Sequence, residues 1–189
     1  GRRDISIGNS EIKLNIKLYT DFLFLIILGV LTSLSLPPLN YFFINFLTFT
    51  SFFLFLIHRS NQNINNKLFF FYGWLFGFGY FVTNLYWISI SLTHDPNFKF
   101  LIPLTIILIP SFLSIFYGFI TFFFKIFKPN KLISSFLVFS LIFGILEFIR
   151  GSIFTGFPWN LIAYSLSNQL EVLSITSIIG TYGFNLFCI

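Results

Sequence analysis

Charged residues are scarce in this sequence, as are the residues that usually build soluble catalytic and metal sites. Asp, Glu, Lys and Arg make up 9% of the 189 residues, whereas about a quarter of a soluble domain is charged. The single cysteine, Cys188, excludes an internal disulfide and a multi-cysteine metal site. No nucleotide-binding glycine loop, metal-ligand cluster or plausible Ser-His-Asp set is visible. We therefore expect no cofactor and no metal, and assign no catalytic residue.

Methionine is also absent, even at position 1, and the last residue, Ile189, falls inside an apolar run. We therefore expect the sequence to be a piece of a longer protein. Cys188 lies in the same apolar run, where a thiolate is disfavoured, so we expect an inert, buried thiol.

Hydrophobic residues are abundant, at 56% of the chain, and 32 residues are phenylalanine. A soluble core of this size could not bury so many large rings, so the expected solvent is a lipid bilayer. The basic residues that give the chain its net charge of +5 lie mostly between the apolar runs. It is typical of an orientation signal in a membrane protein, and we expect no nucleic-acid partner.

The apolar residues form successive segments, each a candidate membrane helix. The predicted segments are 21–36, 39–57, 68–92, 100–124, 132–149 and a run that begins at Glu171. The predicted fold is an all-α integral membrane bundle of about six transmembrane helices, the last one truncated. We divide the chain into a basic cytoplasmic N-terminal tail, 1–20, and a multi-pass helical domain, 21–189.

Orientation follows from the distribution of Lys and Arg, which favour the cytoplasmic side. If the N-terminus is cytoplasmic, the inner segments hold Arg2, Arg3, Lys13, Lys17, Arg59, Lys67, Lys125, Lys128 and Lys131. The outer segments hold Lys99 and Arg150. This asymmetry predicts a cytoplasmic N-terminus and cytoplasmic loops at 58–67 and 125–131.

The third segment carries small and polar residues on one helical stripe. They are Gly73, Gly77, Tyr80, Asn84, Trp87 and Ser91. Gly73 and Gly77 form a G-x-x-x-G pattern, which lets another helix approach closely, so we interpret the stripe mainly as a packing face. Asn84 is the exception, because an amide within the membrane requires a partner or a water-filled cavity.

The stretch from 144 to 160 is the most unusual part of the chain. Glu147 and Arg150 are three residues apart and are expected to pair on one helix face. Pro158 cannot continue the helix and restricts Phe157, so the chain should leave the membrane here or fold back along its outer surface. Residues 161–170 are expected to form a short interfacial segment.

These residues also resemble a known family. Glu147-Phe-Ile-Arg150-Gly151, Thr155-Gly-Phe157-Pro158-Trp159 and Tyr164-Ser165 resemble the pattern E-x-x-R-G…T-G-F-P-W…Y-S of bacterial apolipoprotein N-acyltransferases. Asn84-Leu-Tyr-Trp87 and Gly180-Thr-Tyr-Gly183 are similar to further regions of that family. The resemblance covers residues 21–189, and the T-G-F-P-W element is its specific part.

The resemblance implies an enzyme of the bacterial inner membrane that takes part in lipoprotein biosynthesis. Such an enzyme moves an acyl chain from a phospholipid donor to the N-terminal diacylglyceryl-cysteine of an apolipoprotein acceptor. Its Glu-Lys-Cys triad belongs to a nitrilase-like domain that follows the helices. Cys188 does not match that triad, so we expect this chain to be inactive alone.

The same residues suggest roles at the outer interface. Phe157, Pro158 and Trp159 either contact the lipid substrate or anchor the protein, since Trp favours this depth in either case. Glu147 and Arg150 are interpreted as a structural pair that orients the loop, with Asn84 and Trp87 as further supporting residues.

Two other classes of protein remain open on the sequence alone. A transporter or channel subunit could use Glu147, Asn84 and the kinking prolines to line a pathway, although no internal repeat is evident. A non-catalytic membrane scaffold would also be compatible with the glycine-rich packing face.

Overall fold

The computed structural model describes residues 2–62, 64–91, 93, 96–153, 160–169, 171 and 174–189. Side chains are described for residues 16–62, 64–86, 90, 93, 99–153, 160–169, 171 and 174–189. The elements are α1 (Arg2–Ser33), α2 (Phe43–Ser60), α3 (Asn66–Ser91), η1 (Pro96–Leu101), α4 (Ile102–Phe127), α5 (Leu132–Ile153), η2 (Ile162–Leu166) and α7 (Thr176–Cys188). Because these elements are all helical, the predicted all-α class is confirmed for the described part of the chain.

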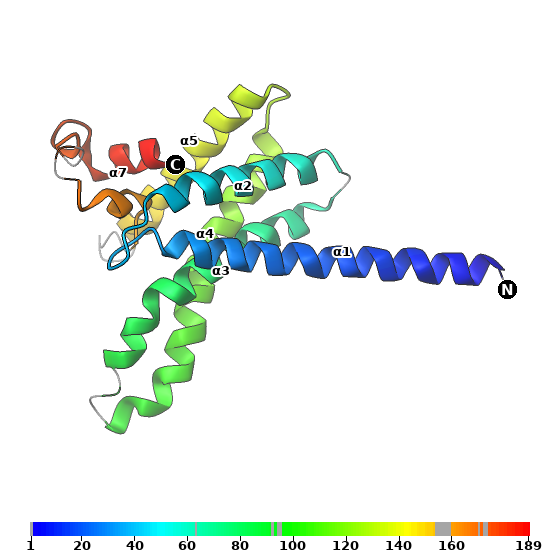
Figure 1. Cartoon of the computed structure of the whole chain (residues 1–189), viewed down its shortest axis with the longest axis horizontal. Coiled ribbons are helices and arrows are strands. Elements are labelled where there is room, and N and C mark those ends of the chain that lie inside the picture. Colours follow the sequence, from blue (N-terminus) through cyan, green and yellow to red (C-terminus); the bar gives the residue numbers. More distant parts are fainter. Residues whose placement is uncertain are drawn as a thin grey trace.

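Five of the helices are long and apolar enough to cross a membrane. The five stretches are Ile16–Ser33, Phe43–Ser60, Asn66–Tyr86, Lys99–Phe127 and Leu132–Ile153. The sixth predicted segment contains α7, which has 13 residues and is interrupted at Gly180, whose φ is 73°. Figure 1 shows α7 beside the N-terminal half of α2.

Two predicted boundaries differ from the structure. The helix α1 begins at Arg2, so the segment predicted as a tail is helical, and its separation as a unit stays a prediction. The helix α2 continues to Ser60, although a polar loop was predicted from residue 58. The prediction was wrong at Arg59, which is 6% exposed, because a partner on another helix makes its burial favourable.

The helices α3 and α4 pack along much of their length, and the predicted G-x-x-x-G pattern lies in their contact. A side chain at Gly73 would overlap the Tyr117 carbonyl oxygen, and a Cβ at Gly77 would lie 2.8 Å from that of Tyr117. The prediction of a close helix approach at these two glycines is confirmed. A second close crossing joins α1 to α3, where Gly29 faces the backbone of Phe76.

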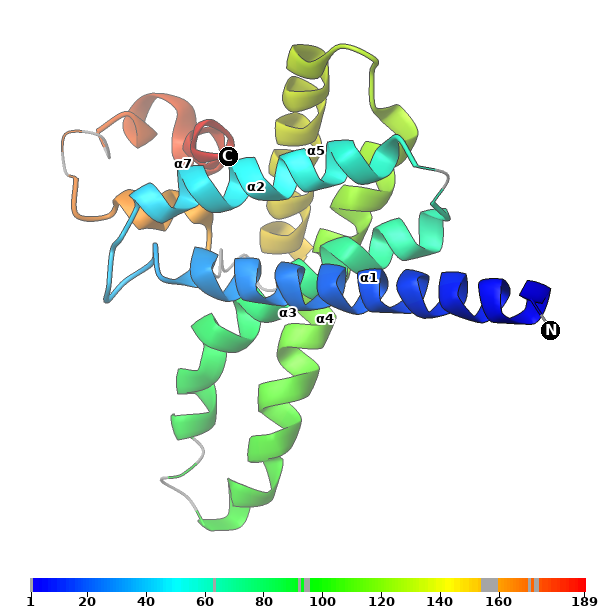
Figure 2. The ribbon, with the colours of Figure 1, turned by 45° about the vertical axis from the view of Figure 1, so that its right-hand side comes forward.

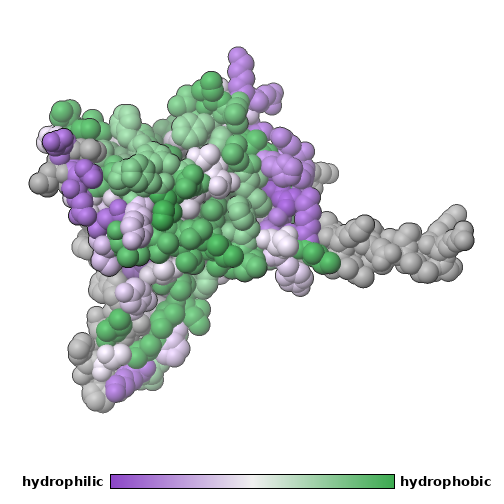
Figure 3. All heavy atoms as spheres, in the orientation of Figure 1, coloured by the Kyte–Doolittle hydropathy of each residue, from purple (hydrophilic) through white to green (hydrophobic). Residues whose placement is uncertain are grey.

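Aromatic rings fill the centre of the bundle. The rings of Phe52 and Phe76 stack with their centroids 4.1 Å apart, and the edge-to-face pair of Tyr117 and Phe143 has a separation of 5.0 Å. All four side chains are at most 1% exposed. In Figure 3, hydrophobic residues cover the middle of the visible surface, while hydrophilic ones gather towards opposite edges. This distribution suits a protein surrounded by lipid.

Three connections between helices can be followed in Figure 2. The N-terminus and the α2–α3 connection lie at the right, the α4–α5 connection lies at the upper right, and the α1–α2 connection lies at the left. The Lys128 Nζ donates to the Asn61 Oδ1 at 3.3 Å, which joins two of the connections on the same side. The relative arrangement agrees with the predicted topology, and the cytoplasmic assignment of that side stays a prediction.

Candidate functional site

Glu147 and Arg150 form the expected ion pair near the C-terminal end of α5. The Arg150 Nη2 donates to the Glu147 Oε2 at 2.7 Å, and its Nε donates to the Oε1 at 3.2 Å. The two residues are 0% and 2% exposed. The pair therefore lies inside the bundle, where two-point contact offsets part of the cost of removing both charges from water.

Aromatic side chains surround this ion pair. The Arg150 guanidinium carbon lies 5.4 Å from the centroid of the Phe81 ring. The ring of Phe81 in turn packs edge-to-face against that of Tyr117 on α4, with the centroids 5.2 Å apart. The pair thus connects α5 with α3 and α4, and its role in supporting a site stays a proposal.

Residues 160–166 follow the T-G-F-P-W element, and they are held by polar side chains from three helices. The Tyr80 hydroxyl of α3 donates to the Asn160 carbonyl oxygen at 2.8 Å. The Asn45 Nδ2 of α2 donates to the Ser165 Oγ at 2.9 Å. The Ala163 N–H donates to the Asn185 Oδ1 of α7 at 3.0 Å. We call these three interactions the polar clamp.

The expected interfacial location of residues 161–170 stays a prediction. Within the protein, Leu161, Ile162 and Ala163 of this segment are at most 2% exposed. Side chains far away in the sequence satisfy polar groups of this short segment and so permit its burial.

A pocket of about 700 Å³ lies between this segment, the end of α3 and the α1–α2 connection. Asn84 and Asn160 both contribute to its lining. The Asn84 Nδ2 also donates to the Tyr80 carbonyl oxygen of its own helix at 2.9 Å. Asn84 was predicted to have either a partner or a cavity, and the structure gives it both. Tyr164 also contributes to the lining, and burial raises the pKa of its phenol above the ordinary value.

Other predicted site residues cannot be placed. Phe157, Pro158 and Trp159 lie outside the described residues, as does the side chain of Trp87. The sequence reasoning did not select Asn45, Asn160 or Asn185. An amide within an apolar helix was a usable signal for the first and last of these, because such a group needs a partner in the membrane.

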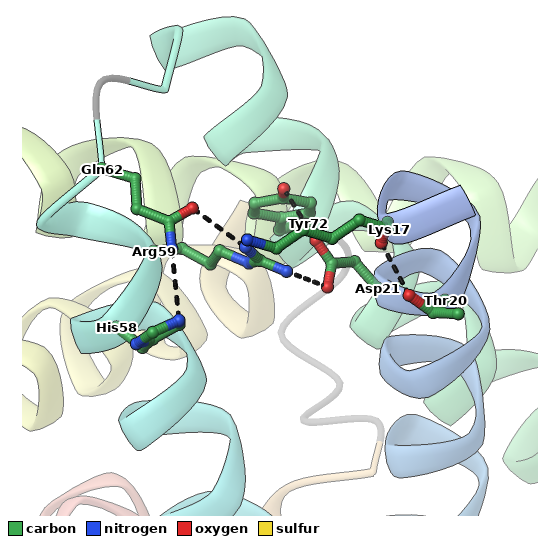
Figure 4. A network of polar contacts seen from close by, with 7 residues as sticks. All are labelled: Lys17, Thr20, Asp21, His58, Arg59, Gln62 and Tyr72. Atoms are coloured by element: carbon green, nitrogen blue, oxygen red, sulfur yellow. Dashed lines mark hydrogen bonds and ion pairs between the residues drawn. The ribbon is translucent and has the colours of Figure 1, made fainter. Parts of the chain in front are cut away.

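A second polar cluster lies at the opposite side of the bundle, near the connection between α2 and α3 (Figure 4). Arg59 pairs with Asp21 of α1, and the Tyr72 hydroxyl of α3 donates to the Asp21 Oδ2 at 3.3 Å. Gln62 accepts a hydrogen bond from the Arg59 Nη1 at 2.9 Å. These residues join three helices, and the sequence reasoning missed them because it assigned Arg59 to a loop.

Few of the described side chains are of the types that hold metal ions or act as nucleophiles. No group of three or more His, Cys, Asp and Glu side chains among them could hold a metal ion. Cys188 is partly buried in α7, beside Phe184 and Leu166 in a smaller pocket. The arrangement can hold the short segment 160–166 and a pocket whose described lining carries no charged side chain within an apolar bundle.

The fold and these contacts define a polytopic helical membrane protein with a buried ion pair next to a clamped segment. Residues 28–189 match the family model described as the apolipoprotein N-acyltransferase N-terminal domain. The chain belongs to the apolipoprotein N-acyltransferase family, and the resemblance noted in the sequence is confirmed.

Curated relatives with the name apolipoprotein N-acyltransferase support this assignment. The protein of Rhizobium etli is 35% identical over 162 residues, which are 82% of this chain and 30% of the relative. The protein of Rickettsia prowazekii is 33% identical over 177 residues, 91% of this chain and 34% of the relative. The chain thus spans about a third of the length of these relatives.

Proposed function

We propose that this chain is the membrane domain of an apolipoprotein N-acyltransferase. The enzyme would transfer an acyl chain from a phospholipid to the α-amino group of the diacylglyceryl-cysteine of an apolipoprotein. The match of residues 28–189 to the N-terminal domain of the family carries this proposal. We further propose that it resides in the bacterial inner membrane with a cytoplasmic N-terminus, which the distribution of Lys and Arg supports.

We propose that Phe157, Pro158 and Trp159 contact the lipid substrate at the outer side of the membrane. Support comes from the next residue, Asn160, whose carbonyl oxygen accepts a hydrogen bond from Tyr80 and which contributes to the lining of the pocket. Glu147 and Arg150, in the interior of the bundle, would keep α5 in place before this stretch, and Asn84 and Trp87 would support it from α3.

We propose that residues 1–189 carry no catalytic nucleophile. Cys188 is the one thiol in the sequence, and it lies in an apolar helix where the reactive thiolate is disfavoured. Acyl transfer through a thioester would therefore require residues beyond this range.

The test compares the complete gene product with residues 1–189, each purified in detergent with phospholipid and a diacylated lipopeptide. We expect a triacylated product from the complete protein and none above background from residues 1–189. Cys188→Ala in the complete protein should retain the activity. Turnover by residues 1–189 that is lost in Cys188→Ala would contradict the inert thiol. Solute flux through proteoliposomes, without acyl transfer, would favour the transporter alternative.

A further inference from the structure

We infer that a basic surface beside the α2–α3 connection binds the headgroups of anionic phospholipids. This basic surface consists of four residues at the start of α3, the end of α4 and the α4–α5 connection: Lys67, Lys125, Lys128 and Lys131. It lies at the opposite end of α3 from Asn84 and the pocket of about 700 Å³. The inference goes beyond the proposed function and requires no acyl transfer.

Contacts between two connections bring the lysines of α4 to this side of the bundle. The Lys125 ammonium group donates a hydrogen bond to the Ile64 carbonyl oxygen in the α2–α3 connection. The Lys128 Nζ donates to the Asn61 Oδ1 of the same connection at 3.3 Å. The end of α4 therefore packs against the α2–α3 connection, and both ammonium groups lie at this contact.

The other two lysines lie where helices begin. Lys67 is in the first turn of α3, Lys131 comes directly before α5, and both side chains are exposed. The N-terminus of a helix favours negative charge, yet neither first turn contains an acidic residue. Each lysine therefore places a positive charge at the positive end of a helix dipole. A bound anion would offset this repulsion at both helix ends.

Carboxylates do not balance the charge of the basic surface. Residues 58–67 and 125–131 contain no Asp or Glu. No ion pair among the described side chains includes one of the four lysines, and the pair on this side joins Asp21 to Arg59. The positive charge of the basic surface is thus available to a ligand.

The apolar residues next to these lysines indicate that the anion belongs to a lipid. Phe127 at the end of α4 is 63% exposed, and Ile133 in the first turn of α5 is 77% exposed. A nucleic acid or an acidic peptide would leave such side chains in water, which is unfavourable. An anionic phospholipid provides a phosphate for the ammonium groups and acyl chains for the apolar side chains, and lysine clusters at the ends of membrane helices attract such headgroups.

The test measures lipid binding to the complete gene product by native mass spectrometry. The wild type should bind dioleoylphosphatidylglycerol, which is anionic, more tightly than dioleoylphosphatidylcholine, which is zwitterionic. We expect Lys67→Gln and Lys131→Gln each to weaken the binding of phosphatidylglycerol about 5-fold, because one lysine near an anionic headgroup changes the affinity by about this factor. Their binding of phosphatidylcholine should equal that of the wild type.

Lys99→Gln is the matched control. Lys99 is exposed in η1, which follows the other end of α3, and its substitution removes the same charge. This variant should bind phosphatidylglycerol as tightly as the wild type. Lys131→Arg keeps the charge and should also bind like the wild type, which separates a loss of charge from a change in folding.

Three results would overturn the inference. The first is equal binding of the two lipids by the wild type, and the second is an equal loss of phosphatidylglycerol binding in Lys99→Gln and Lys131→Gln. The third is tighter binding of a single-stranded oligonucleotide than of phosphatidylglycerol, lost in the same variants. Normal lipid binding without acyl transfer would count against the proposed function alone.

Discussion

At the scale of single residues, Glu147 and Arg150 depend on each other for their burial. Both lie in the interior, and each interacts with the other through two hydrogen bonds. We expect Glu147→Leu to destabilise the fold by about 3–5 kcal/mol, because it leaves a buried guanidinium without its counter-charge. The measurement is thermal unfolding of the purified protein in detergent.

The double variant Glu147→Leu with Arg150→Met is the control for this prediction. Removing both charges avoids the unpaired charge, so its unfolding temperature should be higher than that of Glu147→Leu alone. A double variant that is less stable than the single variant would show that Arg150 stabilises the fold through contacts other than the one with Glu147.

Trp159 has two proposed roles that a pair of substitutions separates. Trp159→Ala in the complete gene product removes an aromatic side chain, a group that typically buries about 150–250 Å², and Trp159→Phe retains an aromatic ring. If the indole shapes the substrate site, we expect acyl transfer per inserted molecule to fall by up to about 10²-fold in the alanine variant, because small displacements of reacting groups are costly. Equal normalised rates in both variants and the wild type would leave an anchoring role.

The residue pairs show which contacts the sequence could predict. Glu147 and Arg150 are three residues apart on one helix, so the geometry of a helix alone places them together. Arg59 and Asp21 are 38 residues apart and meet because α1 and α2 lie side by side in one particular register. That register depends on packing between helices, which periodicity within one segment does not specify.

At the scale of elements, the same limit applies to η2. Its sequence is apolar and follows a proline-containing turn, which does not indicate what the segment packs against. Ser165 of η2 accepts a hydrogen bond from Asn45, which is 120 residues earlier in the chain. By contrast, the close helix approach at the G-x-x-x-G pattern of α3 could be predicted from the sequence. Two glycines on successive turns leave one face of a helix without side chains, and this follows from the sequence of that helix alone.

The clamp interaction of Asn185 with Ala163 can be tested by hydrogen exchange. We expect Asn185→Leu to leave the Ala163 N–H without an acceptor, which costs about 1–3 kcal/mol for a buried donor. Amides of residues 160–166 should then exchange about 5- to 150-fold faster, since local opening becomes easier by that free energy.

Residues 102–127 of α4, which contribute no side chain to the polar clamp, provide the internal reference for this measurement. Their exchange should remain unchanged if the effect is confined to the clamped segment. Faster exchange throughout the protein would indicate global destabilisation and would contradict a local role of Asn185.

At the scale of the whole molecule, the alternation of the connections predicts which positions a membrane-impermeant reagent can reach. In a Cys188→Ser background, single cysteines at Asn63 and Asn97 should label from opposite sides, with Asn63 accessible from the cytoplasm. The reason is that α3, which lies between them, is long and apolar enough to cross the membrane once. Labelling of both positions from the same side would contradict the topology.

The polar clamp also has a consequence for the order of events during synthesis. Asn45 is made 120 residues before its partner Ser165, an interval of roughly 6–24 s at about 5–20 residues per second. Asn185 follows Ala163 by a further 22 residues. The nascent protein therefore holds the Asn45 amide of α2 and the Tyr80 phenol of α3 without these partners until residues 160–165 have been made, and the Ala163 N–H without its acceptor until Asn185 of α7 follows. Seating of residues 160–166 is accordingly a late step of assembly, and until then the growing chain presents polar groups that a membrane chaperone could recognise.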